Sequence, residues 1–259
     1  MKRSINKKKF LILNKKFYII IIFFFLFLFI IFFIFYNVKE IKSFFLTNVK
    51  IYSQKYGYEL NSFKVKGIEV IEISEIDYLI KSYYDKSIFL IPLDEVSKKI
   101  MENNWIESVN LSVDFFNTLY IDIKEYKPVG IYIFNNKEYY FIESGKIIDN
   151  FNKNLNLNNY YIRFSGKNSN KKAILLIKII EKIEKGFIKN ISQANFIGNR
   201  RWDLILNNQI NIKLSENQIE KSLQNFFKLR KKVSIDELNK IKIIDLRDIN
   251  KAIIEFKDD

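Results

Sequence analysis

Apolar and polar positions along the chain fall into distinct patterns. Residues 17–36 are aliphatic or aromatic throughout and carry no charge. At about 1.5 Å of rise per residue, a helix of this length spans roughly 30 Å, the thickness of the hydrocarbon core of a bilayer. Residues 60–259 instead mix strand-type alternation with helix-type spacing. The pattern predicts one membrane helix, a connector over residues 37–59 and folded domains beyond it.

Residues 60–127 predict a small α+β domain. "FKVKGIEVIE" reads as a strand that bends at Gly67 and then resumes, and two helices follow it. "WIESVNLSVDFFNTLYIDIKE", residues 105–125, predicts a hairpin with one buried face and one solvent-exposed face. The order is strand, helix, helix, strand, strand. The positions expected to point inward are Ile76, Leu79, Ile80, Tyr83, Val96, Ile100, Val109, Leu111, Val113, Leu119, Ile121 and Ile123.

Residues 128–259 predict a second, mixed α/β domain. Asparagine pairs at 135–136 and 207–208 lie between alternating runs and indicate hairpin turns. "AILLIKIIEKIEKG" has helical spacing, and a further helix runs to about Leu229. An asparagine-rich loop is expected at 150–159, and "IKIIDLRDINKAIIEF" closes the chain as two strands. We expect a sheet in which antiparallel pairs predominate.

Charge at the N-terminus sets the predicted orientation. Residues 1–16 hold seven Lys or Arg and no acidic residue. Under the positive-inside rule this tail is cytoplasmic and the folded domains lie on the other side of the membrane. A cleaved signal peptide is the alternative, but no A-x-A-like site follows the apolar segment. The rest of the formal net charge of +14 is dispersed and contains no nucleic-acid reader motif.

The composition argues against an enzyme. The chain contains no His and no Cys, which removes the commonest general base, the usual metal ligands and any disulfide. The carboxylate pairs Glu72/Glu75 and Glu181/Glu184 stand among lysines, as on solvated helix faces. Trp105 and Trp202 adjoin alternating strands and are expected in packing. We expect no catalytic residue, no cofactor and no metal site.

Several motifs in series resemble the FtsQ/DivIB family of bacterial division proteins. "NNWIESVNLSVDFFNTLYIDIKEYKP" is similar to the end of the family's POTRA domain, and "RWDL" and "IDLR" are similar to motifs of its second domain. The pattern departs from the family at Asn104 and Asn117, which replace prolines, at Tyr126, which replaces an arginine, and at Asp248, which replaces a tyrosine.

The resemblance implies a specific organisation and role. It implies a basic cytoplasmic tail (1–16), a transmembrane helix (17–36), a POTRA domain (60–127) and an FtsQ-type β domain (128–259) in a single-pass type II protein of the inner membrane. It further implies a divisome scaffold at the septum that docks FtsB and FtsL and thereby serves the wall synthases FtsW and FtsI. Another membrane-anchored POTRA protein, acting in outer-membrane assembly or secretion, is the alternative, and an anchored wall hydrolase is a third class.

The last strand is the predicted partner site. "KAIIEF" is short and β-prone, and a terminal strand that lies at a sheet edge can accept a strand from another chain. Simple closure of the sheet is the alternative. The residues expected to contact FtsB are Arg247, Asp248, Ile249, Lys251, Ala252, Ile253, Ile254, Glu255 and Phe256.

Overall fold

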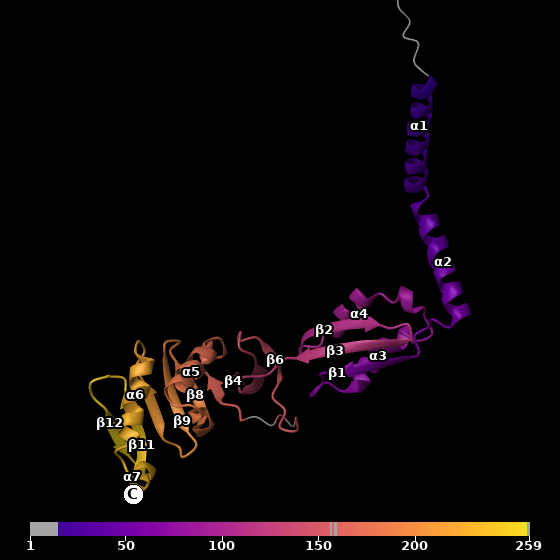
Figure 1. Cartoon of the computed structure of the whole chain (residues 1–259). Helices are drawn as coiled ribbons and strands as arrows, with labels where there is room; N and C mark the ends of the chain where they lie inside the picture. The colour runs from indigo at the N-terminus through magenta and orange to yellow at the C-terminus, as the bar shows by residue number, and fades with distance from the viewer. Residues whose placement is uncertain (1–14, 156, 158–159, 258–259) are drawn as a thin grey trace, which may run out of the picture. The chain divides into compact units, whose positions relative to one another are not determined.

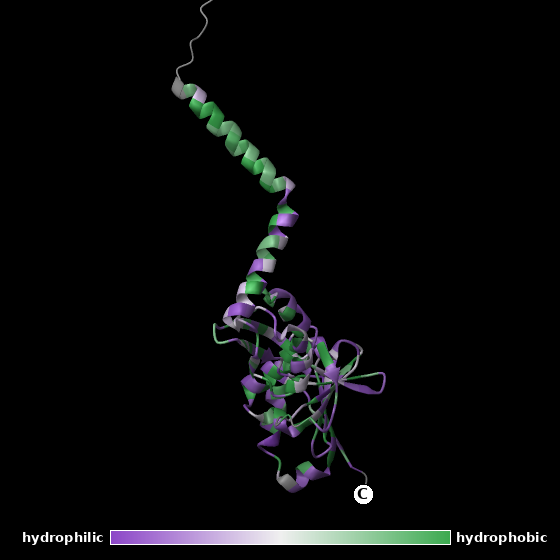
Figure 2. Ribbon diagram, turned by 90° about the vertical axis from the view of Figure 1, so that its right-hand side faces the viewer, coloured by the Kyte–Doolittle hydropathy of each residue, from purple (hydrophilic) through white to green (hydrophobic). Residues whose placement is uncertain are grey.

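The computed structural model describes residues 15–155, 157 and 160–257 (Figure 1). Its first helix, α1 (Lys15–Tyr36), contains an apolar run over Phe17–Tyr36 that is long enough to cross a membrane. Figure 2 shows this helix as hydrophobic along its length. The finding agrees with the predicted membrane anchor. The basic tail predicted for residues 1–16 lies almost entirely outside the described residues.

Most of the connector predicted over residues 37–59 is a second helix, α2 (Val38–Tyr56). The Asn37 N–H donates to the Phe33 carbonyl at 3.0 Å, and the Ile41 N–H donates to the Asn37 carbonyl at 2.9 Å, so the helical hydrogen bonds continue across the junction with α1. Gly57, with φ +74°, ends α2 in the left-handed conformation that favours glycine.

A three-stranded sheet with strand order β1-β3-β2 follows α2. The chain order of its elements is the predicted strand, helix, helix, strand, strand (Figure 1). Short 3-10 turns, η1 (Lys81–Tyr83) and η2 (Ile88–Leu90), separate the two helices. The elements are β1 (Ser62–Lys66), α3 (Ile73–Ile80), α4 (Leu93–Ile100), β2 (Ile106–Val113) and β3 (Thr118–Glu125).

The alternation predicted for this sheet holds best in β3. Leu119, Ile121 and Ile123 are each at most 2% exposed, and the residues between them are half-buried or exposed. The apolar faces of the two helices are buried as well, at Ile76, Ile80, Val96 and Ile100. In β2 the predicted inward residues Val109, Leu111 and Val113 are only half-buried.

The prediction that the strand resumes after Gly67 is wrong, because β1 ends at Lys66. Gly67 has φ +80°, and a Cβ at this position would lie 1.9 Å from the Ile123 carbonyl oxygen. Beyond it, the N–H groups of Val70 and Ile71 donate to the Glu125 carboxylate, each at 3.0 Å. A side chain far along the sequence therefore satisfies the donors that a strand partner would otherwise take.

The second sheet has nine described strands in the order β12-β11-β10-β9-β8-β7-β4-β5-β6. Five of its neighbouring pairs are antiparallel and three are parallel, so the predicted predominance of antiparallel pairing is confirmed among the described residues. The strands are β4 (Gly130–Phe134), β5 (Lys137–Phe141), β6 (Ile147–Asn150), β7 (Arg163–Ser165), β8 (Ile191–Ile197), β9 (Arg201–Leu206), β10 (Asn211–Leu214), β11 (Ile241–Leu246) and β12 (Ile253–Phe256).

Over β7–β12, one face of this sheet is buried and the other is mostly polar. Helices α5 (Ser169–Ile183) and α6 (Ile219–Arg230) share a core with the buried face. Residues in register across the strands form its central row, namely Phe164, Ala194, Leu204, Ile212 and Ile244. The next register row, on the opposite face, is Ser165, Asn195, Asp203, Lys213, Asp245 and Ile253.

Several elements of this domain were not predicted. They are β7, β8, the 3-10 helix η3 (Phe187–Asn190) and α7 (Ile235–Lys240), which Ser234 and Glu237 start with a capping box. The loop predicted at 150–159 includes residues 156, 158 and 159, which lie outside the described residues. Trp105 and Trp202 are 5% and 2% exposed, as expected for packing, and Trp202 lies against Phe196 with ring centroids 4.6 Å apart.

Candidate partner-binding site at the edge strand

β12 is an edge strand of the nine-stranded sheet. Within the described part of the chain, β11 is the only strand beside it (Figure 1). The two strands pair antiparallel, with Asp245 opposite Ile253 and Ile244 opposite Ile254. β12 therefore offers one hydrogen-bonding edge that no described strand covers.

One hydrogen bond fixes which amides of β12 face that free edge. The Lys257 N–H donates to the Lys240 carbonyl at 2.8 Å, toward the β11 side. Successive N–H groups of a strand point in opposite directions, so the N–H groups of Ile253 and Glu255 also face β11. The irregularity in this pairing falls between Ile241 and Ile243 and leaves β12 regular. The N–H groups of Ile254 and Phe256 consequently point outward.

The side chains of β12 divide between the two faces of the sheet. Ile254 lies on the helix-covered face, where it packs against the core. Phe256, two residues further along the strand, projects from the same face as Ile254 and is 56% exposed. On the polar face, Ile253 is 54% exposed and Glu255 pairs with Lys242 at 2.7 Å. The edge thus exposes apolar surface on both faces beside free backbone donors.

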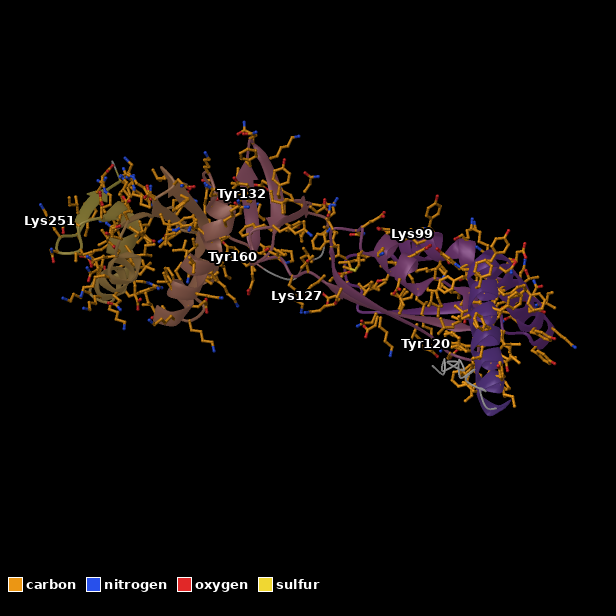
Figure 3. All side chains as sticks on the ribbon, turned by 90° about the horizontal axis from the view of Figure 1, so that it is seen from above. Lys99, Tyr120, Lys127, Tyr132, Tyr160 and Lys251 are labelled. Carbon is orange, nitrogen blue, oxygen red and sulfur yellow. The ribbon has the colours of Figure 1, made fainter. Side chains whose placement is uncertain are left out.

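The segment preceding β12 is a turn, which corrects the longer strand expected from "KAIIEF". Asp248 organises it: its carboxylate accepts the Asn250 N–H at 2.9 Å, and its carbonyl accepts the Lys251 N–H at 3.3 Å. The Asn225 amide of α6 donates to the Ile249 carbonyl at 2.8 Å. Lys251 is labelled in this turn at the yellow end of the chain in Figure 3. Five of the nine predicted contact residues therefore precede the edge strand.

Asp245 and Arg247 form a pair at the end of β11. The Arg247 guanidinium donates to the Asp245 carboxylate through Nε at 2.9 Å and through a terminal nitrogen at 2.6 Å. Burial of the Asp245 carboxyl opposes its ionisation, but the hydrogen bonds and positive charge of Arg247 outweigh burial. The pKa of Asp245 therefore lies below its usual value. Asp245 lies directly across from Ile253 of β12.

Sequence reasoning missed the charged row that leads to this pair. Lys213 of β10 lies between Asp203 and Asp245 in register, and Arg201 donates to Asp203 at 3.3 Å. These residues come from three strands: a turn separates β9 from β10 in sequence, and helices α6 and α7 separate β10 from β11. No local spacing signals the row, which appears only once the strand order is known.

The Asp245–Arg247 pair predicts a pH-dependent contribution to stability. Because the folded-state pKa of Asp245 is lowered, the stabilisation is fully present above the unfolded pKa and is lost as pH falls through the folded value. Arg247→Ala should lower the melting temperature at pH 7, and the difference from wild type should be smaller at about pH 3, which lies below the usual aspartate pKa of about 3.9. Thermal unfolding followed by circular dichroism measures both. A difference that stays constant between these pH values would contradict this account.

Other free edges exist among the described strands, at β6 of the large sheet and at β1 and β2 of the small one. Residues 15–155, 157 and 160–257 contain no cluster of three acidic side chains suited to a metal ion.

Two family models match the chain. Residues 59–126 match the POTRA domain, FtsQ-type, and residues 131–247 match the C-terminal part of cell division protein FtsQ/DivIB. Cell division protein FtsQ of Rickettsia conorii is 31% identical over 215 residues, which cover 83% of this chain and 79% of the relative. The chain belongs to the FtsQ/DivIB family. FtsQ of Rickettsia bellii is 32% identical over 82% of this chain and 78% of its own length.

Membership of the FtsQ/DivIB family supports a role in the divisome, and the family is a scaffold of cell division rather than a class of enzymes. The three-stranded sheet with its two helices falls within the residues that match the FtsQ-type POTRA domain. The match to the C-terminal FtsQ/DivIB model ends at Arg247, before β12 begins. Support for a docking site on β12 therefore comes from the geometry of the strand itself.

Proposed function

We propose that this chain is a non-enzymatic, single-pass scaffold of the divisome. Helix α1 spans the inner membrane, the basic N-terminal tail is cytoplasmic, and the POTRA domain (60–127) and β domain (128–259) lie in the periplasm at the septum. The apolar run of α1 and the basic residues before it support this topology. The family match supports the divisome role.

The partner we propose for β12 is the periplasmic part of FtsB, which brings FtsL with it. The observation that carries this proposal is the uncovered edge of β12, with the N–H groups of Ile254 and Phe256 directed away from β11. An extended segment can add to such an edge through main-chain hydrogen bonds, while its alternate side chains pack on the two faces. Through this contact the scaffold would place FtsW and FtsI for septal wall synthesis.

The faces of β12 define what the added strand should look like. On the helix-covered face its side chains would meet Ile254 and Phe256, so apolar residues fit there. On the polar face they would meet Ile253 and Glu255, close to the Asp245–Arg247 pair. We therefore expect an amphipathic extended segment with alternating apolar residues and some charge complementarity on its other face.

Truncation tests this proposal in the full-length chain reconstituted in lipid nanodiscs. Removing residues 251–259 deletes β12, and binding of the periplasmic part of FtsB should be lost while membrane insertion persists. Removing only residues 257–259 keeps the whole of β12 and should preserve most of the binding. Pull-down with tagged FtsB reads out both variants.

Binding that survives removal of residues 251–259 would refute the edge-strand proposal. Absence of binding in the wild type would remove FtsB as the partner and favour another function for the POTRA domain. The circular dichroism spectrum of each variant shows whether the remainder of the β domain stays folded.

A further inference from the structure

Helix α2 carries an apolar stripe that the rest of the protein leaves largely uncovered. Its spacing of three and four residues places all members of the stripe on one helical face. Apart from the half-buried Val49, each member is at least 44% exposed. The stripe comprises Val38, Ile41, Phe45, Val49, Tyr52 and Tyr56.

The C-terminal end of α2 is fixed to the end of the three-stranded sheet domain that holds η2 and the β2–β3 turn. Ser53 and Ser87 share a buried hydrogen bond of 2.6 Å, and the Asn117 amide of the β2–β3 turn donates to the Gly57 carbonyl at 2.6 Å. The Ile88 N–H adds a bond to the Tyr58 carbonyl at 3.1 Å. These segments belong to one compact unit, so the stripe and the end of the domain form a single surface.

Aromatic side chains extend the surface across this end. The rings of Tyr58 and Phe89 lie 5.6 Å apart, and those of Phe89 and Phe115 lie 6.3 Å apart. Phe115 and Phe116, in the β2–β3 turn, are 73% and 86% exposed. An exposed apolar patch of this extent on a protein surface marks a site of interaction.

A groove of about 650 Å³ lies between the stripe and η2. Tyr52 and Tyr56 line one side, and Phe89 and Leu90 line the other. Ser53 and Ser87, which are buried beside it, are already hydrogen-bonded to each other. The groove therefore offers apolar walls and aromatic rims to whatever covers it.

We propose that this surface, comprising the α2 stripe, Phe89, Phe115 and Phe116, rests on the lipid bilayer at the level of the headgroups. Continuity argues for lipid, because only Asn37 separates α2 from α1. Composition agrees, because aromatic residues concentrate at membrane interfaces and amphipathic helices with basic polar faces lie in that plane. Figure 2 shows the alternation of hydrophilic and hydrophobic residues along α2.

The charge of α2 also favours a contact with lipid, and it indicates that the lipid is anionic. The helix carries Lys39, Lys42, Lys50 and Lys55 against a single acidic residue, Glu40. Lysines near an anionic surface are attracted to it electrostatically. Anionic phospholipid is therefore the expected partner, and it would hold the POTRA domain against the bilayer instead of on a free tether. The proposal rests on α1 as the membrane anchor and is independent of β12.

The absence of cysteine from the chain makes spin labelling a clean test. Single cysteines replace Tyr52 on the stripe and Phe116 at the end of the domain, with controls at Gln54, on the opposite face of α2, and at Lys185 in the β domain. Full-length protein is reconstituted in nanodiscs that contain phosphatidylglycerol. Electron paramagnetic resonance then compares the accessibility of each label to oxygen and to an aqueous nickel chelate.

The labels at Tyr52 and Phe116 should lose accessibility to the nickel chelate and gain it to oxygen, while the two controls stay aqueous. Nanodiscs of neutral lipid should weaken the contrast. Equal aqueous accessibility at all four positions would overturn the proposal and leave the surface for a protein partner. Phe256→Pro should not change the pattern, which separates this test from that of the β12 site.

Discussion

Phe256→Pro is expected to weaken binding of the periplasmic part of FtsB by at least about 100-fold, which corresponds to about 2.7 kcal/mol. Proline removes the outward N–H of Phe256, which we propose donates to the added strand. The partner carbonyl then stays unsatisfied at a cost of about 1–3 kcal/mol, and the ring obstructs the approaching backbone.

Phe256→Ala is the matched control for this substitution. Alanine removes the same exposed side chain but keeps the N–H, so binding should weaken by less than about tenfold. Both variants should keep the fold, because an edge strand tolerates proline where its N–H faces away from the sheet. Glu255→Pro, which removes an N–H that faces β11, should instead lower the melting temperature. Equal affinities for Phe256→Pro and Phe256→Ala would show that the backbone edge takes no part.

Gly67→Ala is expected to destabilise the POTRA domain by about 3 kcal/mol or more. The new Cβ would lie 1.9 Å from the Ile123 carbonyl oxygen, so either β1 or β3 must move. The residue would also hold φ +80°, which costs an L-residue about 1 kcal/mol in itself. Chemical denaturation of the full-length chain, followed by the fluorescence of Trp105 in a Trp202→Phe background, measures the change.

Gly57→Ala separates the two causes. Gly57 has a similar φ of +74°, but no other group lies within 4 Å of the point where a Cβ would stand. Its substitution should therefore cost only about 1 kcal/mol, the conformational part alone. Similar losses in the two variants would mean that β1 and β3 separate easily and that the close approach at Gly67 is not a constraint on the fold.

The local pattern of apolar and polar residues was sufficient to predict strands that pair with the next strand in the chain. The hairpin of β2 and β3 could be predicted because its two strands pair with each other and β3 alternates between buried and exposed positions. β8 escaped prediction because it pairs with β7 on one side and β9 on the other and keeps no strict alternation of burial. β7 has only three residues, too few to show a period.

Long-range contacts account for the remaining differences. Residues after Gly67 have the composition of a strand, yet Glu125, 54 positions beyond Ile71, accepts their N–H groups. At the candidate site, the final strand was predicted from its β-prone residues. Its place at the sheet edge and the outward direction of Ile254 and Phe256 depend on strand order and register, which no local pattern contains.

Amide hydrogen exchange at single-residue resolution tests the central claim most directly. The full-length chain in nanodiscs is compared with and without the periplasmic part of FtsB. If FtsB adds a strand to β12, exchange at the Ile254 and Phe256 amides slows strongly on binding, and the amides of Ile253 and Glu255, already bonded to β11, change little. Protection that appears only at β6 or in the POTRA domain, with Ile254 and Phe256 unchanged, would contradict the account.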